Sequence, residues 1–86
     1  MQNAVTVALI EAKIAEEEFL NPGSIPHMTI AVLTLKNGFA VVGTSAPADP
    51  LNFNADIGRQ LSRADAMRQV WSLEGYLLRE QMSAEV

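Results

Sequence analysis

The sequence predicts an α+β fold with an N-terminal helix, a two-stranded antiparallel β-hairpin, and one or two C-terminal helices. Two observations support this prediction. Turn-forming residues cluster at 21–26, 36–38 and 47–50 and divide the chain into three parts. The middle part is rich in β-branched residues, whereas hydrophobic residues in the outer parts recur every three to four positions. With 86 residues, 49% of them hydrophobic, the chain is expected to form a single small domain, residues 1–86.

The first part, residues 1–20, is expected to be helical. Asn3 is a suitable N-cap, and the alanines and glutamates that follow favour a helix. The segment 21–23, Asn-Pro-Gly, stops it.

Residues 28–46 are predicted to form the hairpin. Asn37-Gly38 is the preferred pair for a two-residue type I′ turn, because both central residues of that turn need positive φ. A two-residue loop would place Leu33 opposite Val42.

Both faces of this predicted hairpin carry apolar residues, and one layer of helices covers only one of them. We therefore expect a symmetric homodimer that buries the other face. The residues expected at this interface are Ile30, Val32, Phe39, Val41 and the single tryptophan, Trp71.

Residues 49–82 are predicted to be helical. Asp49 before Pro50 suits a helix start, and Asn52 or Asn54 are alternative caps. Ser72 is a candidate cap for a second segment, so one long helix and two shorter helices both fit the pattern. A hydrophobic stripe runs along this part at helical spacing: Phe53, Ile57, Leu61, Ala64 and Trp71.

Composition argues against several classes of function. The net charge of −4 disfavours direct nucleic-acid binding, which needs a cationic surface. The apolar runs are too short to cross a membrane, and the start of the chain lacks the basic residues of a signal peptide. The chain has no cysteine and one histidine, His27, in a loop, so we expect no metal site, no cofactor and no catalytic residues.

Arg59 and Arg63 are the residues with the best spacing for ligand binding. They are four positions apart and so project from one helix face. With Asn52 near the helix N-terminus they are candidates for holding a phosphate or carboxylate. The alternative is a solvated face on which the arginines pair with Asp56 and Asp65.

The chain resembles the small tailed-phage proteins grouped around gene 49 of phage N-four and gene 66 of phage Sf-six. The resemblance covers residues 30–78 and rests on the segments 33–39, 52–53, 57–59, Trp71 and 73–78. The sequence departs from the family pattern at Ala46, Asn54 and Ser72. The resemblance implies a phage or prophage origin and expression in the bacterial host cytoplasm, but it implies no activity and no site residues.

We therefore expect a non-enzymatic phage accessory protein that binds and modulates or inhibits a host protein, with host defence systems such as CRISPR complexes among the expected targets. Its acidity would favour encounter with a basic surface on such a target. One alternative is a homo-oligomer that sequesters a nucleotide through Arg59 and Arg63. Another is a minor virion or assembly component.

Overall fold

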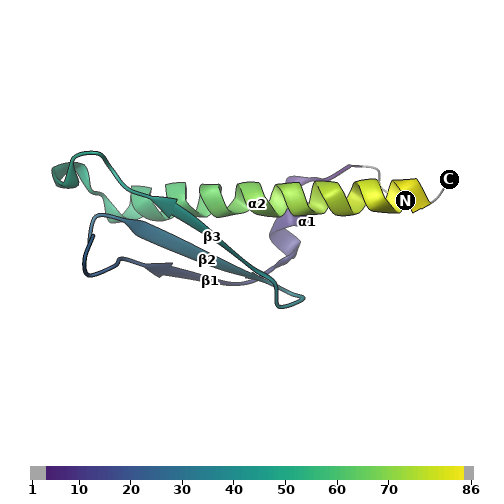
Figure 1. Ribbon diagram of the computed structural model, residues 1–86, viewed down its shortest axis with the longest axis horizontal. Helices are drawn as coiled ribbons and strands as arrows, with labels where there is room; N and C mark the ends of the chain where they lie inside the picture. Colours follow the sequence, from purple (N-terminus) through teal and green to yellow (C-terminus); the bar gives the residue numbers. More distant parts are fainter. Residues whose placement is uncertain (1–3, 85–86) are drawn as a thin grey trace.

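The computed structural model describes residues 4–84 and confirms an α+β fold (Figure 1). The elements are α1 (Val7–Ala12), β1 (Ile14–Leu20), β2 (Thr29–Leu35), β3 (Ala40–Ser45), the 3-10 turn η1 (Pro50–Asn52) and α2 (Ala55–Ala84). Strands β1, β2 and β3 form an antiparallel sheet in that order, and α2 lies along one face of it. The molecule is elongated, 54 × 22 × 19 Å, because α2 is longer than the sheet that it covers.

The predicted helix over residues 1–20 is wrong in its second half. Only Val7–Ala12 are helical, with Thr6 rather than Asn3 as the N-cap, and Asn3 lies outside the described residues. Residues 14–20 form β1, which pairs with β2 and makes the sheet three-stranded. The local preference of Glu16 and its neighbours for a helix is outweighed, because β1 supplies hydrogen-bond partners for the edge of β2 that β3 leaves unpaired.

The hairpin between β2 and β3 is confirmed, but its predicted turn and register are wrong. Gly38 has φ +91°, whereas Asn37 has negative φ, so the turn is not type I′. The Gly38 N–H donates to the Leu35 carbonyl at 2.9 Å, and the Leu35 N–H donates to the Phe39 carbonyl at 2.7 Å. These two bonds close a three-residue loop with glycine in the left-handed position.

The longer loop shifts the register by one residue, so that Leu33 pairs with Val41 and not with Val42. Val41 therefore lies in the core, 4% exposed, and the prediction that it lies on the uncovered face is wrong. Val42 takes that place and is exposed. A one-residue slip has this effect because side chains alternate between the two faces of a strand.

The inner face of α2 consists of small residues. Its buried positions follow every fourth residue, Gly58, Ser62, Ala66 and Val70. A Cβ atom built on Gly43 of β3 would lie 2.2 Å from the Ser62 carbonyl oxygen and 2.3 Å from the Ala66 nitrogen. The strand and helix backbones thus meet directly, and only glycine fits at position 43.

Side chains of α2 also form hydrogen bonds with backbone groups on the unpaired edge of β3. The Thr44 N–H donates to Asp65 at 2.9 Å, and the Gln69 side-chain amide donates to the Val42 carbonyl at 2.5 Å. The Thr44 N–H and the Arg68 guanidinium hold the pKa of Asp65 below its usual range. These contacts occupy backbone groups that would otherwise be available for pairing with another strand.

The C-terminal half of the chain contains one long helix, with no break at Ser72. Asp49 accepts from the Leu51 N–H and starts η1, as predicted. Of the two alternative caps, Asn54 begins α2 by accepting from the Ile57 N–H at 3.1 Å. Because the small residues face the sheet, the hydrophobic stripe that includes Ile57 points outward.

We predict that Gly43→Ala destabilises the fold by about 3 kcal/mol or more, because the methyl group would force β3 off the backbone of α2. Urea unfolding measures the change. Gly23→Ala is the matched control, since a Cβ at Gly23 meets nothing within 4 Å. Equal stability of the two variants would mean that β3 and α2 are not in direct backbone contact.

We predict that Gly38→Val lowers the free energy of unfolding by about 1–2 kcal/mol, because a β-branched residue resists positive φ. Gly38→Asn should lose less, since asparagine tolerates the left-handed region. Thermal unfolding of both variants provides the comparison. If the Gly38→Val variant unfolds at the same temperature as the parent, the loop does not have the conformation described.

Candidate functional site

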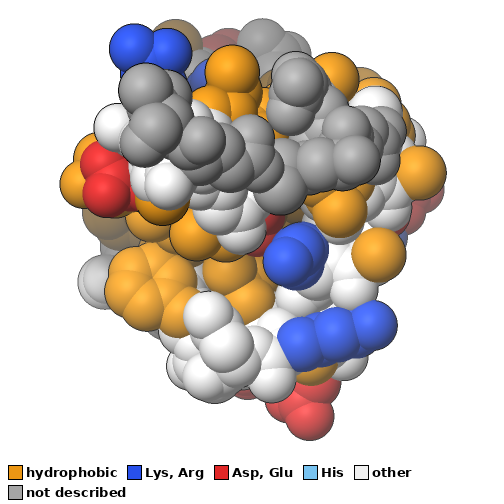
Figure 2. All heavy atoms as spheres, turned by 90° about the vertical axis from the view of Figure 1, so that its right-hand side faces the viewer, with side chains coloured by type: hydrophobic (Ala, Val, Ile, Leu, Met, Phe, Trp, Pro, Cys, Tyr) orange, Lys and Arg blue, Asp and Glu red, His pale blue; other side chains and the backbone are white. Residues whose placement is uncertain are grey.

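The C-terminal part of α2 extends beyond the hairpin loop and leaves a cleft beneath it. Figure 2 faces this end of the molecule, where hydrophobic side chains lie in a hollow with basic side chains along one side. Two adjoining depressions of about 200 and 240 Å³ share Leu35, Asn37, Glu74 and Leu77. We call this depression the overhang cleft. It exists because the sheet ends before the helix does.

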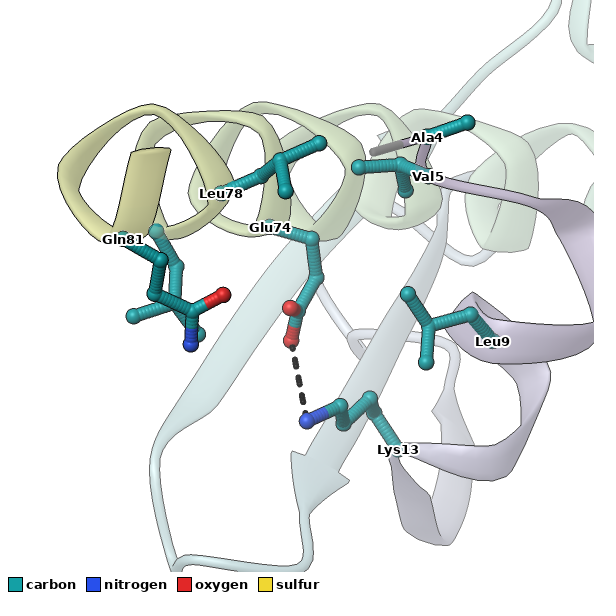
Figure 3. A pocket seen from close by; sticks show the side chains of 8 residues that line it. Ala4, Val5, Leu9, Lys13, Glu74, Leu78 and Gln81 are labelled. Atoms are coloured by element: carbon teal, nitrogen blue, oxygen red, sulfur yellow. Dashed lines mark ion pairs between the residues drawn. The ribbon is translucent and has the colours of Figure 1, made fainter. Parts of the chain in front are cut away.

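A second cleft lies on the other side of the same helix segment, between α2 and the N-terminal segment (Figure 3). Its volume is about 240 Å³. The residues that line it are Ala4, Val5, Leu9, Lys13, Glu74, Leu77, Leu78 and Gln81. Because Lys13, Glu74 and Leu77 line both clefts, the two form one surface divided by these side chains.

Two of the dividing side chains, Lys13 and Glu74, form an ion pair. Lys13 Nζ lies 3.8 Å from Glu74 Oε1, and the Glu74 side chain is only 12% exposed. The Lys13 carbonyl also accepts from the Lys36 N–H at 2.9 Å, which ties the hairpin loop to the end of α1. The surface is therefore held by three elements, α1, the loop and α2.

The chemistry of this surface suits binding. Apolar side chains from the loop and the helix, Phe39, Leu73 and Leu77, lie beside the charges of Lys13 and Glu74. Such a combination fits an apolar side chain flanked by polar groups of a partner. Within residues 4–84 no group of three histidine, cysteine, aspartate or glutamate side chains is arranged to hold a metal ion.

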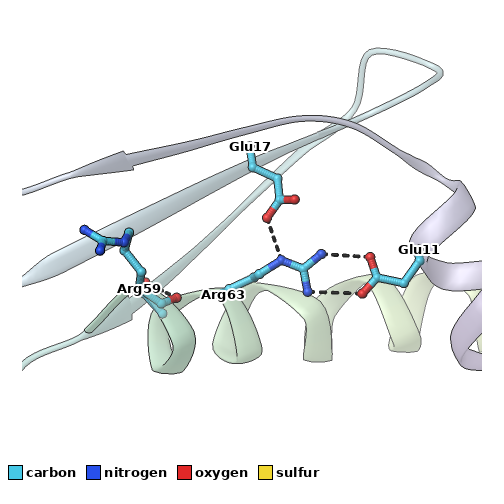
Figure 4. A network of polar contacts seen from close by, with 5 residues as sticks. Glu11, Glu17, Arg59 and Arg63 are labelled. Atoms are coloured by element: carbon cyan, nitrogen blue, oxygen red, sulfur yellow. Dashed lines mark hydrogen bonds and ion pairs between the residues drawn. The ribbon is translucent and has the colours of Figure 1, made fainter. Parts of the chain in front are cut away.

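The two candidate arginines have different environments (Figure 4). Arg63 donates to both carboxylate oxygens of Glu11, at 2.8 and 3.1 Å, and to Glu17 at 2.5 Å. Arg59 pairs with Asp56 on its own helix, and its guanidinium is turned away from this network. Arg63 thus links α2 to α1 and to β1.

The structure does not bring the three predicted anion-binding residues together. Arg63 faces α1 and β1, whereas Asn52 lines a separate cleft of about 100 Å³ between η1 and the end of β3. Arg59 lines neither that cleft nor the overhang cleft. A ligand that used Arg63 would have to displace two carboxylates.

The remaining predicted interface residues lie on different surfaces. Ile30 and Val32 are half-buried on the uncovered face of the sheet. Phe39 lines the overhang cleft and is 53% exposed, and Trp71 lies on α2 at 37% exposed.

Sequence reasoning missed the role of Lys13, Glu74 and the Leu73–Leu77 pair. The two leucines are four residues apart, a spacing that places them on one helix face. That pattern alone does not show that the sheet stops short of them.

Comparison with known proteins identifies the family of the chain. The family model described as Phage protein (N4 Gp49/phage Sf6 gene 66) family matches residues 5–82. The match confirms the resemblance and extends it to the N-terminal segment that the resemblance omitted. No curated protein and no solved structure matches the chain significantly.

We predict that the Arg63 network makes stability depend on acidity. The hydrogen bond from Arg63 holds the pKa of Glu11 below its usual value, so the folded state resists protonation of this carboxylate. This contribution is complete above the ordinary pKa of glutamate and is lost as the pH falls through the lowered value. In the Arg63→Met variant the free energy of unfolding, measured with urea, should therefore fall less between about pH 5 and 3 than it does in the parent. Arg59→Met is the control, and an equal slope in both variants would contradict the role of Arg63.

Proposed function

Since the chain belongs to the N4 Gp49/phage Sf6 gene 66 family of phage proteins, we propose that it is a non-enzymatic accessory protein that binds and modulates a host protein. The overhang cleft is the single observation that carries this proposal. It is an open, partly apolar depression held by three elements, and its lining includes the exposed Phe39, Leu73 and Leu77.

The proposed partner is a protein of the bacterial host cytoplasm, the compartment in which a phage gene is expressed. Within residues 4–84 no helix is both long and apolar enough to span a bilayer. The net charge of −4 would speed encounter with a basic surface. Nucleic-acid-binding complexes of host defence carry such surfaces and are the first class of target to test.

The positions of the candidate anion-binding residues give less support to the alternative function, sequestration of a nucleotide, than to binding of a host protein. The arginine with the most donors in place, Arg63, already binds Glu11 and Glu17. Arg59 and Asn52 do not line a common cleft with it. A phosphate bound at Arg63 would gain less binding free energy than one bound between two arginines without carboxylate partners.

We predict that Leu77→Glu abolishes capture of the host partner. Leu77 borders both clefts, so a carboxylate there would place a charge against the apolar surface of a bound protein. Tagged protein is expressed during infection, and co-purified host proteins are quantified by mass spectrometry. We expect at least a tenfold lower recovery, about 1.4 kcal/mol of binding free energy.

Leu51→Glu is the matched control, because Leu51 is 92% exposed and belongs to η1, a segment at the end of the molecule away from the two clefts. It should recover the same host protein as the parent. The proposal is wrong if no host protein is enriched with the parent above a tag-only control. It is equally wrong if Leu77→Glu, folded by circular dichroism, retains the partner in full.

A further inference from the structure

The outward side of α2 carries a regular series of positions that are hydrophobic except at Arg68 and Gly75. Alternating steps of four and three residues connect Ile57, Leu61, Ala64, Arg68, Trp71, Gly75, Leu78 and Met82. We call this series the outer stripe. This is the heptad spacing by which two helices pack along their length. The sheet cannot use the outer stripe, because it binds the opposite side of α2 through Gly58, Ser62, Ala66 and Val70.

The outer stripe is exposed where its side chains are large. Ile57 is 52% exposed, Leu61 54% and Trp71 37%. Leu78 and Met82 are half-buried, with Leu78 beside the N-terminal segment in Figure 3. An 86-residue domain with few fully buried apolar side chains rarely leaves such a surface free.

We propose that two copies of this chain dimerise by packing the outer stripes of their α2 helices against each other in antiparallel orientation. The stripe is self-complementary in this orientation. Leu61 lies opposite the partner's Leu78, and Ile57 lies opposite the partner's Met82. Ala64 lies opposite the partner's Gly75, so two small residues meet and the helices approach closely beside the large Trp71.

The centre of this arrangement places Arg68 opposite the partner's Trp71. A guanidinium over an indole ring is a favourable contact, and it occurs twice by symmetry. Asp65 is the ion-pair partner of Arg68 within the same chain, so the two arginines near the axis do not bring unpaired charges together. A parallel pair would instead align Arg68 with itself and Trp71 with itself.

The available area corresponds to a small dimer interface. With about 150–250 Å² for each large side chain, the exposed fractions of Ile57, Leu61 and Trp71 amount to on the order of 300 Å² of apolar surface per copy. Because roughly 60% of a dimer interface is apolar, the complete contact would bury about 1,000 Å² in total. About 1,000 Å² is the least that a specific interface is expected to bury. A second copy is therefore sufficient to cover the stripe.

Sedimentation equilibrium across about 1–200 μM, a range in which such interfaces associate, tests the dimer together with the emission of Trp71, the single tryptophan of the chain. We expect a mass near twice 9.3 kDa and a red shift of emission on dilution. Leu61→Glu should weaken self-association at least 100-fold and give the dilute emission spectrum at all concentrations. Leu51→Glu is the control and should behave as the parent. A parent that stays at 9.3 kDa, or a dimer unaffected by Leu61→Glu, overturns the proposal.

Cysteine crosslinking tests the orientation, since the chain has no cysteine of its own. A mixture of Ala64→Cys and Gly75→Cys chains should crosslink through a short bismaleimide, whereas Ala64→Cys alone should not. Efficient crosslinking of Ala64→Cys to itself would show a parallel pair and contradict the proposal. The two proposals meet at Leu78, which belongs to the outer stripe and also lines the second cleft. Their tests remain separate, because Leu61 lines neither the overhang cleft nor the second cleft, and Leu77 is not part of the outer stripe.

Discussion

The close approach of β3 to α2 at Gly43 determines how the rest of the molecule is arranged. No Cβ fits between this strand and the backbone of Ser62 and Ala66, so the helix lies directly on the sheet. That proximity allows Asp65 and Gln69 to reach the outer edge of β3. It also selects small residues for the inner side of α2 and leaves Ile57, Leu61 and Trp71 to face outward.

The length of α2 produces the surfaces available for binding. Thirty residues in a helix span about 45 Å, whereas the sheet ends at the hairpin loop. The part of α2 beyond the loop forms one wall of the overhang cleft, and the outer stripe extends along the other side of the same helix. One element thus offers two surfaces, one proposed for a host protein and one for a second copy. The overhang cleft and the outer stripe have no residue in common, whereas the second cleft shares Leu78 with the stripe.

Arg63 fastens the N-terminal segment to this framework. Its fork geometry matches the two oxygens of Glu11, and Nε remains for Glu17. The three side chains are partly exposed, so the network contributes less than a buried pair would. It nonetheless fixes the position of α1 and therefore of Lys13, which borders both clefts.

Sequence by itself determined the α+β class, the hairpin, the cap at Asp49 and the family, because turn residues, β-branched runs and helix caps act locally. Only tertiary structure decided that residues 14–20 form a strand, since their local preference is helical and the unpaired edge of β2 overrides it. The same holds for the register, in which one extra loop residue moves Val41 into the core. It also holds for the stripe that includes Ile57 and Leu61. Helical spacing shows that these residues share a face, but only the contact at Gly43 decides that this face points away from the sheet.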